Sequence, residues 1–132
     1  MTQLRKLTLK GKILSGEGKG SYFVTLPWAM KQLKKKLEFT PFPGTLNLQI
    51  TSKTALEGLR GSTKGIKIEP PKGFHSGRCF KAVLLGEVQG AVVLPDVPSY
   101  PSDVLEILAP INLREKFNLK DGMELSVTIW LE

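Results

Sequence analysis

The sequence predicts a mainly β protein, built as an antiparallel barrel with one or two short helices. Several segments alternate apolar and polar residues with a period of two, and turns rich in glycine or proline separate them. The chain has no repeated strand–helix–strand unit, the pattern that would indicate a parallel sheet. With 132 residues, 41% of them hydrophobic, the chain can form one compact core, so we expect a single domain over residues 1–132.

The first half of the chain begins with alternating residues. A strand is expected over residues 7–13 and a short one over 22–24. Pro27 opens a helical stretch that ends at about Leu37. Residues 45–51 show the cleanest alternation in the sequence and predict a strand with one apolar and one polar face.

The second half follows a segment, residues 52–63, whose weak pattern indicates a loop or short irregular elements. Asn112 and Glu115 have the spacing of a capping box, which predicts a short helix ending near Asn118. The remaining strands are expected over residues 65–68, 78–85, 88–94, 104–108 and 125–131.

Charge and hydropathy limit the classes of function. The net charge of +7, from 19 Lys+Arg against 12 Asp+Glu, favours a polyanionic partner such as a nucleotide, a nucleic acid or an acidic surface. The lysines at 31, 34, 35 and 36 fit the solvated face of a helix. The sequence contains no run of eighteen apolar residues and no apolar N-terminal leader, so we expect no membrane span and a cytoplasmic location.

Cys79 and His75 are the only cysteine and the only histidine. One of each is too few for a zinc site, and a lone cysteine cannot form an internal disulfide. A nucleophilic pair of the two is the alternative to a Cys79 that simply fills the core, which its apolar neighbours favour. Any chemistry then rests on hydroxyls, amides, carboxylates, backbone groups and a hard metal ion.

A glycine-rich stretch between two expected strands is the first candidate site. Glycines at 16, 18 and 20 would let backbone N–H groups approach phosphate oxygens, and Lys19 would add a positive charge. The spacing fits neither a P-loop nor a dinucleotide fingerprint. The alternative is a flexible hairpin loop that binds nothing.

Three further features could carry chemistry. Thr45 and Asn47 lie on one strand face, where two neutral oxygens could bind magnesium with phosphates and water, or could simply face solvent. Glu106 lies among apolar neighbours and suits a general base or a group that orients a hydroxyl, unless it faces water. The capping-box helix, with Arg114, could bind an anion or serve only its own cap.

Four segments and the C-terminal ending carry a resemblance to a known family. They read Gly16-Glu-Gly-Lys-Gly-Ser-Tyr-Phe, Pro43-Gly-Thr-Leu-Asn-Leu, Gly90-Ala-Val-Val-Leu-Pro, Asp103-Val-Leu-Glu-Ile-Leu-Ala-Pro-Ile-Asn-Leu-Arg and Leu119-Lys-Asp-Gly-Met-Glu-Leu-Ser-Val-Thr-Ile. Together they resemble the archaeal CTP-dependent riboflavin kinases, over nearly the whole chain except residues 52–76. The resemblance implies a small, six-stranded, Greek-key-like cradle-loop barrel that transfers the γ-phosphate of CTP to riboflavin, giving FMN and CDP.

The same resemblance implies roles for particular residues. Magnesium would bind Thr45 and Asn47, the flavin would contact Ser99 and Glu106, and Glu106 would be catalytic. The nucleotide, CTP or CDP, would contact Glu17, Gly18, Lys19, Gly20, Ser21 and Tyr22 together with Ile111, Asn112, Leu113 and Arg114. Two positions depart from the family, because relatives often carry glutamate at Lys19 and threonine at Ser99. The chain is too short for the N-terminal helix-turn-helix domain of some relatives, and we expect a monomer without nucleic-acid or membrane partners.

Two other functions stay open from the residues alone. A barrel with a charge of +7 could bind DNA, which would require a dimer with a basic face and an affinity that falls steeply with salt. The chain could also bind a flavin or nucleotide without catalysis, in which case riboflavin would not be consumed.

Overall fold

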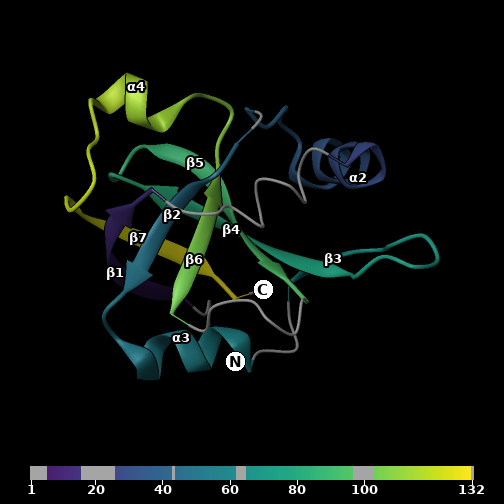
Figure 1. Cartoon of the computed structure of the whole chain (residues 1–132), viewed down its shortest axis with the longest axis horizontal. Coiled ribbons are helices and arrows are strands. Elements are labelled where there is room, and N and C mark those ends of the chain that lie inside the picture. The colour runs from purple at the N-terminus through teal and green to yellow at the C-terminus, as the bar shows by residue number, and fades with distance from the viewer. Residues whose placement is uncertain (1–5, 16–25, 43, 62–64, 97–102, 132) are drawn as a thin grey trace, which may run out of the picture.

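One antiparallel sheet forms the body of the molecule (Figure 1). The computed structural model describes residues 6–15, 26–42, 44–61, 65–96 and 103–131, and within these ranges the sheet has seven strands in the order β3-β4-β5-β6-β2-β1-β7. The strands are β1 (Lys6–Leu14), β2 (Leu46–Ile50), β3 (Ile66–Ile68), β4 (Gly77–Leu84), β5 (Val88–Pro95), β6 (Val104–Leu108) and β7 (Glu124–Trp130). Strand β4 also pairs with β7, which closes six strands into a barrel and leaves β3 as an extension.

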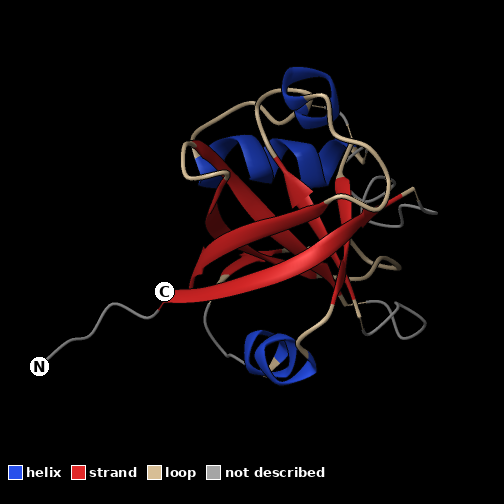
Figure 2. Ribbon diagram, turned by 90° about the vertical axis from the view of Figure 1, so that its left-hand side faces the viewer, coloured by secondary structure: helices blue, strands red, loops and turns tan. Residues whose placement is uncertain are grey.

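Three helices accompany the strands in the described ranges: α2 (Pro27–Leu37), α3 (Lys53–Arg60) and α4 (Leu113–Phe117). Helices α4 and α3 lie at opposite ends of the barrel, and α2 lies at its side near the projecting hairpin of β3 and β4 (Figure 1). Figure 2 shows the same arrangement from the side, with helices above and below the crossing strands. The predicted mainly β barrel is therefore confirmed. No helix of the described part of the chain is long and apolar enough to cross a membrane.

The barrel interior holds the larger of two apolar clusters. Alternate residues of the strands point inward, among them Leu9, Leu48 and Ile129, all fully buried. Leu56 of α3 and Leu113 of α4 belong to the same cluster, so these two helices cover the two ends of the barrel. The strands of β1 and β2 approach closely at Gly11, where an added Cβ would lie 2.9 Å from the carbonyl oxygen of Gln49.

The second apolar cluster lies outside the barrel, beneath α2. Ala29, Leu33 and Leu37 form the buried face of α2, and they pack with strand residues that include Val93 and Leu108. Pro27 stands in the first turn of this helix, as its sequence predicts. Because α2 covers part of β5 and β6, outward-facing residues of these strands are not all exposed to water.

Helix α3 is the main difference from the sequence prediction, which expected a loop or irregular elements over residues 52–63 and one or two helices in all. Leu56 and Leu59, three residues apart, are 3% and 0% exposed at the end of the barrel. Gly58 lies on the open side, where a Cβ would meet nothing within 4 Å. A short helix with an internal glycine, anchored in its described part by two leucines, gives a weak local signal, and packing against the barrel stabilises it.

Candidate active site

Three predicted side chains meet on the outer face of the barrel. The Thr45 hydroxyl donates a hydrogen bond to Oε1 of Glu106 at 2.7 Å, and its oxygen lies 3.3 Å from Oδ1 of Asn47. A hydroxyl has a single proton, and we assign it to the contact with the carboxylate because that contact is the shorter of the two. Residues separated by about half the chain therefore form one oxygen-rich group, which we call the strand cluster (Thr45, Asn47 and Glu106).

Strand register places the strand cluster. In the antiparallel pairing of β2 with β6, Asn47 lies opposite Glu106, while their neighbours Leu46 and Ile107 lie opposite each other and point into the barrel. Thr45 precedes Asn47 by two residues and so shares its face. A slip of one residue in this pairing would bring the polar group into the apolar core.

Two members of the strand cluster are buried although they face outward, and Thr45 is half-buried. Glu106 is 1% and Asn47 8% exposed. On the other side of β6, Glu106 pairs in register with Val93, a member of the apolar cluster beneath α2. Burial of a carboxylate is costly unless hydrogen bonds satisfy it, and the Thr45 hydroxyl provides one. The structure thus excludes the alternatives in which Asn47 and Glu106 lie on open, solvated strands.

A cavity of about 210 Å³ lies beside the strand cluster. Its walls come from the segment before β2, the end of β6 and the start of α4. Thr45 lines one side, and Ile111, Asn112, Leu113 and Arg114 line the other. The structure therefore brings the predicted metal-binding threonine and the predicted nucleotide-binding segment to the same cavity.

The Asn112 half of the predicted capping box is present at the start of α4. The Asn112 side chain accepts a hydrogen bond from the backbone N–H of Glu115 at 3.2 Å, which fixes the first turn. The helix ends at Asn118, as the sequence predicts, and Asn118 adopts the left-handed conformation. This short helix holds Asn112 and Arg114 at the cavity wall.

Arg114 has an acidic partner that the sequence prediction did not identify. Its Nη2 lies 2.7 Å from Oδ1 of Asp121 and 3.3 Å from the carbonyl oxygen of Leu14, to which it donates. The Ser15 hydroxyl donates to the same Asp121 oxygen at 2.9 Å. Hydrogen bonds from Ser15 and Arg114 hold the pKa of Asp121 below its usual value. We call Ser15, Arg114 and Asp121 the turn cluster.

Several predicted site residues lie outside the described part of the chain. These are Glu17, Gly18, Lys19, Gly20, Ser21, Tyr22 and Ser99, together with the short strand expected over residues 22–24. Their predicted contacts with nucleotide and flavin stay predictions.

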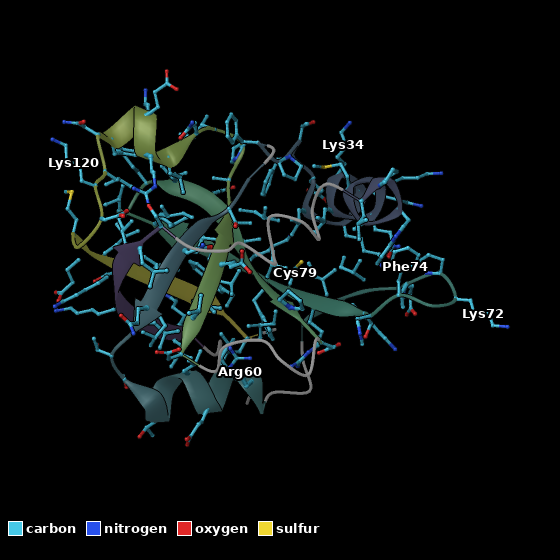
Figure 3. The ribbon with its side chains drawn as sticks, viewed as in Figure 1. Lys34, Arg60, Lys72, Phe74, Cys79 and Lys120 are labelled. Atoms are coloured by element: carbon cyan, nitrogen blue, oxygen red, sulfur yellow. The ribbon has the colours of Figure 1, made fainter. Side chains whose placement is uncertain are left out.

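Cys79 is a core residue, as its apolar neighbours predicted. It is 0% exposed, and burial raises the pKa of its thiol to about 12, whereas His75 is exposed. Figure 3 shows Cys79 within the body of the molecule, while Lys34 on α2 and Lys72 at the β3–β4 hairpin point away from it. A buried, protonated thiol is a poor nucleophile, so the alternative Cys79–His75 pair is excluded. The four lysines of α2 are all exposed and form a solvated face.

The donor atoms of the strand cluster suit a hard cation. Threonine hydroxyl, asparagine carbonyl and carboxylate oxygens are the ligand types that magnesium prefers, and magnesium usually completes its shell with water and phosphate oxygens. No group of three or more His, Cys, Asp or Glu side chains that could hold a metal occurs in the described ranges. A metal here would therefore need a ligand such as a nucleotide to supply further oxygens.

Asp121 and Ser15 are the site residues that sequence reasoning missed. The dipeptide Asp121–Gly122 predicts a turn, and Ser15 opens the glycine-rich stretch but is assigned no contact there. The pairing of the N-terminal with the C-terminal strand would have identified them, because it brings Ser15 and Asp121 together although they are 106 positions apart.

Comparison with known proteins gives one family and a set of relatives. The model of the CTP-dep_RFKase family, described as "Domain of unknown function DUF120", matches residues 13–129. A protein of Methanosarcina barkeri named riboflavin kinase is 45% identical over an alignment of 121 positions, which covers 88% of this chain and 53% of the relative. Those of Pyrobaculum aerophilum and Sulfolobus acidocaldarius are 37% and 38% identical over 97% and 96% of this chain, and 63% and 84% of their own lengths. The chain spans about half the length of the first of these curated relatives.

Proposed function

This chain belongs to the CTP-dep_RFKase family, and we propose that it is a riboflavin kinase that uses CTP to convert riboflavin to FMN. The observation that carries this proposal is the strand cluster, in which a half-buried hydroxyl lines the same cavity as Arg114 and contacts a buried amide and a buried carboxylate. The relatives named riboflavin kinase support the acceptor. The choice of CTP as donor is supported by the family name alone.

The reaction moves one phosphoryl group. The oxygen of the ribityl 5′-hydroxyl forms a bond to the γ-phosphorus of CTP, the bond from that phosphorus to the bridging oxygen breaks, and CDP leaves with the electron pair. Little covalent chemistry is asked of the protein in such a transfer, which depends on in-line positioning and on neutralising phosphate charge. The arrangement of fixed polar groups around one cavity suits that task.

Glu106 is proposed to act on the attacking hydroxyl. Its carboxylate is buried, and one oxygen accepts the Thr45 hydroxyl at 2.7 Å, so its position is fixed before substrate binds. It would orient the ribityl hydroxyl and accept its proton as the new bond to phosphorus forms. Ser99 would contact the same flavin, as the family resemblance implies.

Thr45 and Asn47 are proposed to hold a magnesium ion. Because the Thr45 proton is directed to Glu106, the lone pairs of its oxygen stay available to a cation. When bound with the nucleotide, magnesium would neutralise phosphate charge. The nucleotide itself is proposed to contact residues 111–114, which line the cavity, and the glycine-rich residues 17–22.

The direct test is to incubate the purified protein with riboflavin, magnesium and each nucleoside triphosphate in turn, and to follow FMN by chromatography. We expect FMN with CTP and little with ATP, GTP or UTP. A protein that consumes no riboflavin with any of the four would contradict the kinase proposal, and equal rates with ATP and CTP would contradict the donor.

A further inference from the structure

We infer that Asp121 is a positioning residue for the nucleotide, because it joins the start of the glycine-rich stretch to the helix that lines the cavity. The inference rests on the proposed function and extends it to a residue outside the cavity wall. Asp121 does not line the cavity, so it would act through Arg114 and Ser15.

One carboxylate oxygen makes the connection. Oδ1 of Asp121 accepts from Nη2 of Arg114 at 2.7 Å and from the Ser15 hydroxyl at 2.9 Å. The same Nη2 lies 3.3 Å from the carbonyl oxygen of Leu14, the last residue of β1. The end of β1, the second residue of α4 and the turn before β7 therefore meet at a single charged group.

The backbone holds this group in place. The N–H of Gly122 donates to the carbonyl oxygen of Ile13 at 2.7 Å, and the N–H of Ile13 donates to Met123 at 2.9 Å. These bonds continue the pairing of β1 with β7 beyond the end of the ladder, and they set residue 121 opposite residues 14–15. An ion pair in a fixed frame needs less ordering of long side chains than an isolated surface pair.

Arg114 is the link from Asp121 to the ligand. It lines the same cavity as Thr45, and its carbonyl oxygen accepts from the backbone N–H groups of Asn118 and Leu119. A guanidinium has five N–H donors, and the bonds described above use Nη2, so donors on Nη1 and Nε can serve an anion. Asp121 thus fixes the guanidinium at the cavity wall before the anion arrives.

Ser15 is the second side chain that the Asp121 carboxylate holds, directly after the end of β1. One carboxylate therefore fixes Ser15 and Arg114 relative to each other. Fixing the Arg114 guanidinium in advance removes part of the conformational entropy that binding would otherwise cost. Loss of the Asp121 carboxylate should weaken nucleotide binding without disturbing the flavin side of the site.

Simple charge repulsion predicts the opposite result. A carboxylate close to an anion site disfavours the anion, so its removal would tighten nucleotide binding. The sign of the change in affinity therefore distinguishes positioning from repulsion.

The test measures the Kd of CTP with magnesium by calorimetry for the wild type, Asp121→Asn and a control, Glu87→Gln. Glu87 lies in the exposed turn between β4 and β5, outside the cavity wall, and its substitution changes the net charge equally. We expect the Kd to rise about fivefold for Asp121→Asn, the upper end for a partly exposed ion pair, and to stay constant for the control. In steady-state assays the KM for CTP should rise by a similar factor, while the riboflavin KM and kcat change less than about twofold.

Several results would overturn the inference. The first is unchanged or tighter CTP binding by folded Asp121→Asn. The second is a rise of the riboflavin KM equal to the rise of the CTP KM. The third is a double variant in which the effects of Asp121→Asn and Arg114→Gln on CTP affinity simply add. If Asp121→Asn does not fold, Ser15→Ala gives the same measurement, and unchanged CTP affinity there overturns the inference as well. A wild type that binds CTP yet makes no FMN would refute the kinase proposal, while the binding data would still decide the role of Asp121.

Discussion

Two polar clusters of different construction reach the cavity, one through Thr45 and the other through Arg114. The strand cluster lies where β2 and β6 pair, and its carboxylate, Glu106, is 1% exposed. The turn cluster lies where the ends of β1, α4 and β7 meet, and the side chain of its carboxylate, Asp121, is 53% exposed. Both clusters join a carboxylate to a hydroxyl at less than 3 Å.

The carboxylate–hydroxyl contact has different effects in the two clusters because their burial differs. In the strand cluster, loss of one partner removes a hydrogen bond from a buried charged group, so the contact affects both stability and chemistry. In the turn cluster, water and salt screen the charges, so the contact contributes little to stability and mainly sets positions. The following predictions test that contrast.

The largest effect is expected from Asn47→Ala. Loss of the amide oxygen should reduce magnesium-dependent FMN formation to background while the circular dichroism spectrum stays that of the folded protein. Gln49→Ala is the matched control, because Gln49 lies on the same strand two residues away and is exposed. Full activity of Asn47→Ala would refute the metal assignment.

Glu106→Gln should lower kcat by about 100-fold or more, the usual contribution of a positioned base, and leave the affinity for CTP unchanged. Glutamine keeps the shape of the side chain and an acceptor for the Thr45 hydroxyl, so the thermal midpoint should change little. Turnover at the wild-type rate would remove the role of Glu106 as base. Glu115→Gln, an exposed residue of α4, is the control for the lost charge.

A paired comparison of hydroxyl deletions separates the two clusters by stability. Thr45→Val leaves the buried Glu106 carboxylate without the 2.7 Å donor and should cost about 1–3 kcal/mol in the free energy of unfolding in urea. Ser15→Ala should cost about 0.5 kcal/mol or less, as do most surface substitutions. Equal losses in the two variants would show that burial does not distinguish the clusters.

The smallest effect is a pH dependence at Asp121. Its hydrogen bonds hold the folded-state pKa below the ordinary value of 3.8, so its contribution to stability is present above pH 3.8 and is lost as the pH falls through the lower folded-state value. The difference in unfolding free energy between wild type and Asp121→Asn should therefore be constant near pH 6 and disappear in strong acid. Urea titrations between pH 2 and pH 6 measure it, and a difference that grows toward acid would contradict the assignment.

Most of the secondary structure could be predicted from local patterns. The strand over residues 45–51 and the helix from Pro27 to Leu37 follow from period-two alternation and an N-terminal proline, and the structure has both. Helix α3 could not be predicted, because its two leucines stabilise it only by packing against the end of the barrel that they cover.

The candidate site could be predicted only in part. The local pattern predicts Thr45, Asn47 and Glu106 separately, and it leaves a buried and a solvated Glu106 both open. The apolar cluster beneath α2 and the register partner Val93 decide that it is buried. Nothing in the sequence around Asp121 indicates a functional role, because Asp–Gly is a common composition of turns.

The sequence by itself determined the class of fold, the position of most strands and helices, and the family, because periodicity and short motifs are properties of neighbouring residues. Only the tertiary structure decided which polar side chains contact one another and which of them water can reach. The physical reason is that strand register joins residues such as Thr45 and Glu106 across 61 positions, and that burial on the outside of a barrel depends on the helix packed there.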